Sequence, residues 1–411
     1  MQRACSVRGT VEITRPDATA AVVVLLRSGE PQGAARSWLI VDYAVVRPKD
    51  PFEFAVGPGA YRAAAFDDAN ADLIYQPNEG FVALDANNAF ECIEGERSDR
   101  WALSIPRTPH ERLDRDVDVA SLQVAAPVDG RAQTLGQVTA VGELVSLSDA
   151  RFDLAVAESG LWRPYDFIYK VHPGVYFLDA YAPEKIPVLF VHGINGSPAQ
   201  FDFLIDRLDR ERFQPWVYSY PSGAQLDASA DLLQQTVAKL QSRYQFKRFI
   251  VVAHSMGGLI SRAFIQRYSG TARAEAPLLV TISTPWGGHA AAQMGIKYAP
   301  AVVDVWRDMA PGSAFLSGLF ASKLPDGTTH HLIFTFGRNS TSFGISDDET
   351  VSVATQLYAA AQTEATHVYG VDDTHTGVLR NDSVAALLNA LLATQSANAP
   401  AALSIDRKEL R

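Results

Sequence analysis

The stretch that decides the fold is Ala253–Gly257, which reads Ala-His-Ser-Met-Gly. It follows the apolar run Arg248–Val252 and precedes Gly258–Phe264, whose composition favours a helix. A serine between small residues is typical of a nucleophile elbow, because the tight turn from a buried strand into a helix leaves no room for large side chains near it. The helix N-terminus would point the backbone N–H of Met256 at the site, where it can hold an oxyanion. The pentapeptide alone leaves open an ordinary strand–helix turn.

A second strand-and-loop unit lies upstream. Ile186–Val191 is apolar on both faces, as in a buried parallel strand, and it ends in the loop His192–Pro198. Such a loop can present a second N–H to the reaction centre, and we expect that donor to be Ile194. Ser197 is predicted to cap the helix that follows. His192 precedes the serine in the chain and lies at a strand end, so we interpret it as structural rather than as the catalytic base.

The acid and the base are predicted further along the chain. Asp347 and Asp348 follow the strand-like stretch His331–Gly337, and His375 follows another short strand-like stretch. The order is therefore serine, acid, histidine, with Ser255 first and His375 last. Among serine-dependent enzymes this order distinguishes one fold from the others.

Residues 161–395 resemble a bacterial α/β-hydrolase of the lipase/esterase type. The resemblance implies a mostly parallel sheet flanked by helices. Two positions depart from the commoner pattern: Ala253 replaces the first glycine of the elbow, and Glu349 replaces the glycine after the acid. Val351 keeps the register of an Asp-Gly-x-Val motif that begins at Asp348, which favours Asp348 over Asp347 without deciding between them. Four motifs carry the resemblance: His192–Ile194, Ala253–Gly258, Ser283–Gly288 and His375–Gly377.

The activity that the resemblance implies is hydrolysis of a small-molecule or lipid ester. Ser255 would attack the acyl carbon, His375 would take its proton and Asp348 would orient the imidazole. This chemistry needs no metal or organic cofactor. An acyltransferase or a thioesterase using the same triad is the alternative, and a non-enzymatic binding protein of the same fold is disfavoured by the intact set of motifs. His254 is expected to pack around the elbow.

Substrate contacts are predicted after the strand-like stretch Leu278–Ile282. Trp286 follows it at the catalytic edge of the sheet and is the candidate substrate-binding residue. Residues 286–325 are expected to form a cap, because Ala290–Phe320 is rich in large apolar side chains that could line an acyl pocket. The alternative is a pair of amphipathic helices that bury their apolar faces on the domain.

Length and charge limit the classes of function. The chain has 411 residues, which suits two domains, and its net charge of −10 argues against a nucleic-acid partner. No apolar run is long enough to span a bilayer. The first six residues lack the apolar core of a signal peptide, so the chain is either cytosolic or begins after a removed signal; we expect a secreted or cell-envelope protein. Cys5 and Cys92 could form a disulfide or remain two free thiols, and the oligomeric state stays open.

The first quarter of the chain has a different pattern. Residues 6–104 contain short β-rich runs separated by turn residues, which predicts a β-sandwich domain. Val56–Phe66 resembles part of a prealbumin-like sandwich module. Residues 105–160 are interpreted as a linker, residues 161–395 as the catalytic domain, and residues 396–411 as a disordered tail.

A stretch within the predicted sandwich partly matches the pattern of a calcium-binding loop. Oxygen-bearing side chains occupy loop positions one, three, five and twelve, as in calcium loops. Position six is Leu73, where such loops need glycine for a sharp turn, so a plain Asp/Asn turn is the alternative. The four candidate ligands are Asp68, Asn70, Asp72 and Glu79.

Overall fold

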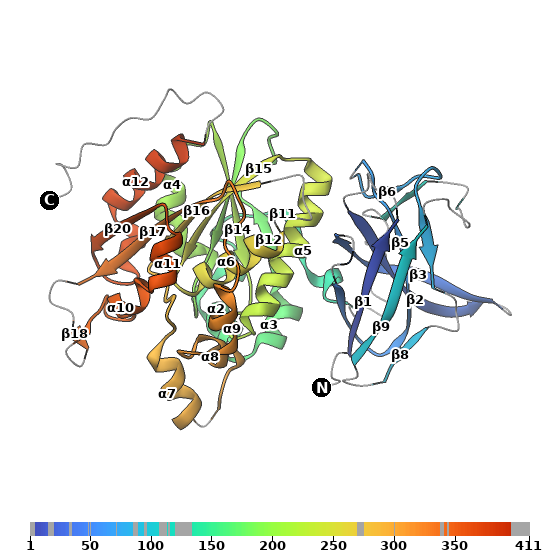
Figure 1. Cartoon of the computed structure of the whole chain (residues 1–411), viewed down its shortest axis with the longest axis horizontal. Helices are drawn as coiled ribbons and strands as arrows, with labels where there is room; N and C mark the ends of the chain where they lie inside the picture. The colour runs from blue at the N-terminus through green and yellow to red at the C-terminus, as the bar shows by residue number, and fades with distance from the viewer. Residues whose placement is uncertain are drawn as a thin grey trace.

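The computed structural model describes most of the chain. The described ranges are residues 5–14, 20–32, 35–47, 49, 51–70, 72–84, 89–93, 97–106, 113, 116–119, 134–268, 275–299, 301–337, 341–342 and 345–395. The predicted disordered tail, 396–411, and the charged stretch 107–112 of the predicted linker lie outside them. The chain forms a β-rich N-terminal region and a larger region built around one sheet, which lie side by side in Figure 1.

The N-terminal region is a sandwich of two main sheets. One sheet has the order β4-β1-β9, and the other has the order β3-β2-β5-β7, with β8 also pairing with β5. A short pair joins β6 and β10. The strands are β1 (Cys5–Ile13), β2 (Ala21–Gln32), β3 (Ala35–Val46), β4 (Pro51–Val56), β5 (Gly59–Phe66), β6 (Ile74–Tyr75), β7 (Phe81–Ala83), β8 (Phe90–Cys92), β9 (Arg97–Ile105) and β10 (Val117–Asp118).

Alternation of apolar residues builds the core of this sandwich. Val7 and Val11 on β1 are fully buried while Thr10 between them is exposed, as expected for a strand with one face on a core. β1 runs antiparallel to β4 and parallel to β9. Cys5 and Cys92 form a disulfide that links β1 to β8, so the open alternative of two free thiols is resolved. The bridge therefore ties one sheet of the sandwich to the other.

The larger region is built on an eight-stranded sheet of order β11-β12-β14-β13-β15-β16-β17-β20. Neighbouring strands are parallel except β12 and β14, which are antiparallel. A small hairpin of β18 and β19 precedes the acid loop. The strands are β11 (Ala140–Leu144), β12 (Gly174–Phe177), β13 (Ile186–Val191), β14 (Phe213–Ser219), β15 (Arg248–His254), β16 (Glu275–Ile282), β17 (Thr329–Phe336), β18 (Thr341–Ser342), β19 (Ile345–Ser346) and β20 (His367–Asp372).

Helices cover both faces of this sheet. Leu189 and Val191 of β13 pack in one core cluster with residues of α5 and α6, while Val188 and Phe190 pack in a second cluster with residues of α4 and α12. The central strands are buried on both sides for this reason. The helices are α2 (Leu154–Trp162), α3 (Pro164–Val171), α4 (Asp202–Asp206), α5 (Leu226–Tyr244), α6 (Met256–Tyr268), α7 (Ala290–Tyr298), α8 (Asp304–Met309), α9 (Ala314–Leu319), α10 (Val353–Gln356), α11 (Ala359–Glu364) and α12 (Asp382–Ala393). Short 3₁₀ turns span Gly136–Val138, Ala150–Phe152, Pro198–Phe201 and Gly377–Arg380.

The prediction of a linker over residues 105–160 is wrong for much of its length. Strand β10 pairs with β6 of the sandwich, and β11 pairs in parallel with β12 as the edge of the large sheet. Leu144 at the end of β11 is 59% exposed. An edge strand that is only partly covered needs no continuous apolar run, so the sequence pattern does not reveal it.

The two regions meet across a buried ion pair. The Nζ atom of Lys239 on α5 lies 3.2 Å from Oδ1 of Asp42 on β3, and it lies 4.3 Å from the centre of the Tyr43 ring. Asp42 also accepts hydrogen bonds from the backbone N–H groups of Tyr43 and Gly136. Figure 1 shows α5 on the side of the large region that faces the sandwich. Among the described residues, no helix combines the length and apolar composition needed to cross a membrane.

Candidate active site

Ser255 lies at the junction of β15 and α6, in a backbone conformation that explains the small residues around it. Its φ angle is 54°, in the left-handed region, and its N–H donates to the carbonyl oxygen of Ile282 at 2.8 Å. A Cβ atom at Gly257 would lie 2.4 Å from the carbonyl oxygen of Val191. A Cβ atom at Gly258 would lie 2.1 Å from Oγ1 of Thr284. Glycines are therefore required where the turn meets its neighbours.

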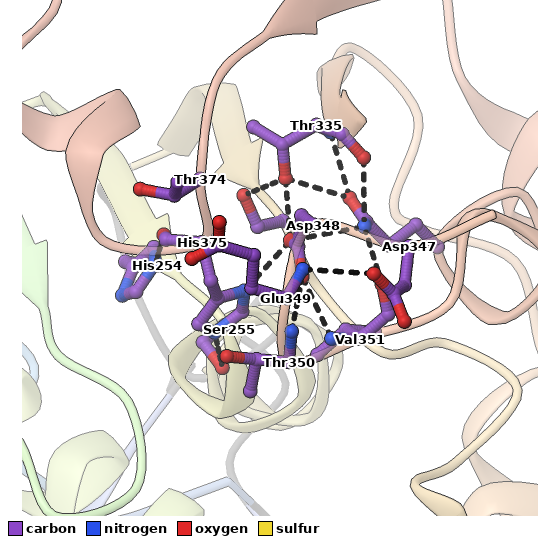
Figure 2. A network of polar contacts seen from close by, with 12 residues as sticks. His254, Ser255, Thr335, Asp347, Asp348, Glu349, Thr350, Val351, Thr374 and His375 are labelled. Atoms are coloured by element: carbon purple, nitrogen blue, oxygen red, sulfur yellow. Dashed lines mark hydrogen bonds and ion pairs between the residues drawn. The ribbon is translucent and has the colours of Figure 1, made fainter. Parts of the chain in front are cut away.

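The structure brings Ser255, His375 and Asp348 into one line of contacts (Figure 2). His375 Nε2 lies 2.9 Å from Ser255 Oγ, and His375 Nδ1 lies 2.8 Å from Asp348 Oδ2. The N–H of His375 also donates to the carbonyl oxygen of Asp348, which fixes the two loops together. All three residues are buried. With Nδ1–H donating to the carboxylate, Nε2 is left to accept the serine proton.

Asp348 is held as an anion by its surroundings. Oδ1 accepts hydrogen bonds from the N–H groups of Thr350 and Val351. Burial by itself would raise the pKa of Asp348. The hydrogen bond and charge of His375, with hydrogen bonds from Thr335 and Val351, outweigh burial and hold this pKa below its ordinary value. The carboxylate therefore stays charged beside the imidazole over the neutral pH range.

The neighbouring Asp347 points into a different set of contacts. Its Oδ1 accepts a hydrogen bond from the N–H of Glu349 at 3.0 Å, and its backbone forms a bridge with Ser352. Asp348 rather than Asp347 lies against His375, as the register of Val351 indicates. Glu349 has a φ of 74°, so this residue adopts the conformation that the glycine of the commoner motif would adopt without strain.

Three further polar residues support the acid, and none of them was predicted from the sequence. The Thr335 hydroxyl donates to Asp348 Oδ2 at 2.5 Å, and it accepts a hydrogen bond from Ser283 Oγ at 2.8 Å. Gln356 Nε2 donates to the same Oδ2 at 3.1 Å, while Gln356 Oε1 accepts from the Thr335 N–H. Gln356 and Thr335 are fully buried. Buried side chains of these types need partners, and this need is the only signal that the sequence carries for them.

Two backbone segments beside Ser255 carry the N–H groups predicted to hold an oxyanion, those of Met256 and Ile194. Met256 is the first residue of α6, and the first N–H groups of a helix have no partner within the helix. The loop after β13 touches the serine from the other side: a Cβ atom at Gly193 would lie 2.8 Å from the Cβ of Ser255. Ile194 follows in that loop, and the N–H of Asn195 donates to Ser222 Oγ at 3.0 Å, which ties the loop to the end of β14.

Two other histidines near the elbow are structural. His192 Nδ1 donates to the carbonyl oxygen of Gly193, and its ring stacks on Tyr220. Burial lowers the pKa of His192 to about 4. His254 Nε2 donates to the carbonyl oxygen of His375 at 2.8 Å, and burial and the charge of His375 lower the pKa of His254 to about 3. Both rings are therefore neutral, and the second one holds the loop that carries His375.

Two residues near the site have partners that the sequence did not predict. Trp286 is only 1% exposed and packs edge-on against Phe320 and His330, and its role in substrate binding stays a prediction. Ser197 precedes a 3₁₀ turn and does not cap it; its Oγ donates instead to the carbonyl oxygen of Phe152. In both cases a neighbour far along the chain provides a partner that the local sequence does not show.

The predicted cap region forms three short helices, α7, α8 and α9. Met309 and Phe315 are buried in the main core cluster, as the alternative of amphipathic helices expects. Met294 and Tyr298 on α7 are instead 56% and 64% exposed. His289 before α7 accepts from the N–H of Ala291 and donates to the carbonyl oxygen of Thr350 in the acid loop. The region thus contacts the acid loop, while its movement as a lid stays a prediction.

The candidate calcium loop binds its own backbone. Asp68 accepts from the N–H groups of Asp72 and Leu73, and Glu79 accepts from those of Ala69 and Gln76. Asn70 donates to Asp72. Within the part of the chain that the structure describes, no group of three or more His, Cys, Asp or Glu side chains could hold a metal ion. Calcium binding here stays a prediction.

Comparison with known proteins agrees with this architecture. Residues 186–311 match the family described as alpha/beta hydrolase fold, a match that supports a hydrolase. No curated protein sequence matches the chain.

Similar solved structures share low sequence identity with this chain. A mature lipase from Bacillus licheniformis is 15% identical, with 53% of this chain and 97% of that chain covered and a TM-score of 0.43. A carboxylesterase structure from Nitrososphaera gargenis is 14% identical, covering 55% and 96%, with a TM-score of 0.38. Phospholipase PlaB from Legionella pneumophila is 18% identical, covering 42% and 45%, with a TM-score of 0.36. The eight-stranded sheet and its helices have the α/β-hydrolase fold, and a β-sandwich module precedes them.

Proposed function

We propose that this protein is a serine carboxylic-ester hydrolase, a lipase or esterase, that acts through an acyl-enzyme on Ser255. The observation that carries the proposal is the buried His375 imidazole, which contacts Ser255 Oγ with one nitrogen and Asp348 with the other. A hydroxyl, an imidazole and a carboxylate in this sequence of contacts form the constellation that activates a serine nucleophile.

Acylation begins with the Ser255 hydroxyl. Its oxygen attacks the carbonyl carbon of the ester while its proton passes to His375 Nε2. Asp348 stabilises the resulting imidazolium through the hydrogen bond to Nδ1. When the tetrahedral intermediate collapses, the bond from carbon to the alcohol oxygen breaks and His375 returns the proton to the leaving alcohol. The acyl group is then joined to Ser255.

Deacylation repeats the sequence with water. His375 takes a proton from water as the hydroxide adds to the acyl carbon, and it returns that proton to Ser255 Oγ when the acid leaves. Every proton in both halves is carried by His375, so the proposed mechanism requires no cofactor. The N–H groups of Met256 and Ile194 would stabilise the oxyanion in each half, and the loss of one such donor typically costs about 3 kcal/mol in the transition state.

The test is hydrolysis of a p-nitrophenyl ester series, from acetate to palmitate, by the wild type and by Ser255→Ala. Ser229→Ala is a matched control, because Ser229 is also buried and its hydroxyl only bonds the carbonyl oxygen of Gln225. We expect turnover by the wild type and the control and none by Ser255→Ala. Normal turnover by Ser255→Ala would refute the mechanism. Ester formation with an added alcohol, in preference to hydrolysis, would make the protein an acyltransferase instead.

A further inference from the structure

A groove of about 460 Å³ opens between the α2–α3 junction and the segment that leads into α8. We propose that this groove binds the acyl chain of the ester, an inference that rests on the proposed function. Its walls include Trp162, Pro164 and Tyr165 on one side and Val302 and Val303 on the other. This volume falls in the range of pockets that hold small ligands.

The chemistry of the groove suits an apolar chain. Val302 and Val303 are half-buried, whereas Arg163 and Asp304 are exposed. The lining is therefore mainly apolar, with two charged side chains at its exposed rim and one half-buried carboxylate, Asp166, among the apolar side chains. Trp162 and Tyr165 are 48% and 68% exposed, so the groove presents aromatic surface to the solvent.

The groove lies next to the loop that touches Ser255. Gly223 forms part of its lining, and the preceding residue, Ser222, accepts the hydrogen bond from the N–H of Asn195. Asn195 follows Ile194, the predicted oxyanion donor, in the loop that touches Ser255 through Gly193. An acyl chain that extends from the carbonyl carbon of the ester along this loop would reach Gly223 next.

The side on which the groove lies favours the acyl chain over the alcohol. In the sheet, β14 lies on one side of β15, while β16, β17 and β20 lie on the other. His375 follows β20, and the groove begins after β14, so the two flank Ser255 from opposite sides. The leaving alcohol must take its proton from His375 and so occupies the β20 side. The acyl chain is left to run toward the groove.

Backbone contacts hold the groove in shape without a ligand. The N–H of Gly223 donates to the carbonyl oxygen of Gly160 in α2. The carbonyl oxygen of Gly223 accepts from the N–H of Val305 in α8. A Cβ atom at Gly223 would lie 1.9 Å from the carbonyl oxygen of Leu161, so only glycine fits there. Trp162 meets Trp306 edge-on across the two walls.

The experiment fills the groove and measures acyl-chain preference. Val303→Trp places an indole between the walls, and Val368→Trp is the matched control because Val368 is exposed on the edge strand β20. We expect Val303→Trp to keep kcat/KM for p-nitrophenyl acetate within about twofold and to lower it for the decanoate ester about tenfold or more, since single methylene contacts in such pockets are worth about tenfold or more. The control should keep the wild-type profile.

Each outcome decides the proposal. An unchanged chain-length profile in a folded Val303→Trp would overturn the proposed role of the groove in binding the acyl chain and leave the proposed function intact. Loss of acetate and decanoate hydrolysis in equal proportion would also overturn it, since the groove would then not distinguish chains. If Val303→Trp does not fold, Trp162→Ala decides in its place by lowering kcat/KM for decanoate more than for acetate. Absence of any Ser255-dependent hydrolysis in the wild type refutes the proposed function itself.

Discussion

The sandwich and the hydrolase region use buried polar groups in opposite ways. In the sandwich, Asp67 and Glu79 are buried and accept hydrogen bonds from backbone N–H groups of their own loops. In the hydrolase region, the buried Thr335, Asp348 and Gln356 bind one another across separate elements, and they meet His375. The first arrangement holds a loop in shape, whereas the second places a carboxylate and an imidazole in contact beside Ser255.

The largest expected effect comes from breaking the hydrolase network at its centre. Asp348→Asn should lower kcat by about 10⁴, because an amide cannot hold the reactive tautomer of His375 or stabilise the imidazolium. Asp347→Asn, one residue away, should change kcat little, since the His375 imidazole contacts the carboxylate of Asp348. Steady-state kinetics on a p-nitrophenyl ester compares them. The reverse ranking would move the acid to Asp347.

A second prediction breaks the contact between the two regions. Asp42→Asn leaves Lys239 buried without its charged partner, and removal of one partner of a buried pair typically costs about 3–5 kcal/mol in the free energy of unfolding. Asp209→Asn is the control, because Asp209 pairs with Arg212 at the surface, where such pairs are worth about 1 kcal/mol or less. Urea titration of both variants measures the difference. Equal losses would mean that the regions are not coupled through this pair.

A third prediction sharpens the role of the residues around the acid. Gln356→Leu removes one hydrogen-bond donor from Asp348 and should lower kcat about tenfold with little change in KM, because hydrogen bonds to charged groups are worth about 1.5–3 kcal/mol. Gln356→Glu keeps the size but places a second carboxylate beside Asp348, and it should be worse than Leu. If kcat and stability fall together in proportion, with KM changed as well, Gln356 only supports the fold.

The smallest effect is a difference in the sign of pH dependence between the two regions. Burial raises the pKa of Glu79 to about 7, so the folded sandwich holds this proton more tightly than the unfolded chain does. The contribution of Glu79 to stability is therefore present below about pH 4.5 and is lost as the pH rises toward 7. Asp348 has a lowered pKa, so its contribution is full above about pH 4 and is lost as the pH falls through the folded pKa.

The measurement for both groups is the free energy of unfolding from pH 3 to pH 8, for the wild type, Glu79→Gln and Asp348→Asn. As the pH rises, the free energy of unfolding of the wild type should fall relative to that of Glu79→Gln. As the pH falls into the acid range, the free energy of unfolding of the wild type should fall relative to that of Asp348→Asn. Parallel curves for the two variants would contradict the contrast.

The sequence predicts the parts of this molecule that depend on local pattern. Ile186–Val191 coincides with β13, because a strand buried on both faces must be apolar throughout. The motif order also predicts which serine, carboxylate and imidazole meet, and the structure brings them together, while their catalytic role stays a prediction. β11 escaped detection because an edge strand carries no such run.

Other features depend on distance in space rather than on pattern. Thr335 and Gln356 reach Asp348 only after folding, and no motif surrounds either residue. The pairing of Cys5 with Cys92 requires their backbones to approach, which two isolated cysteines cannot reveal. Trp286 lies close to a candidate catalytic loop in the sequence, but its side chain is buried in the core. Contacts between distant segments are the common cause of these omissions.

The backbone of Ser255 has a consequence for the history of the chain. A side chain held at a φ of 54° destabilises the folded state, and glycine would adopt this conformation without strain. On the proposed mechanism, exchange of Ser255 for glycine would therefore produce a chain that is easier to fold and inactive. Stability and turnover would then make opposite demands on this one residue.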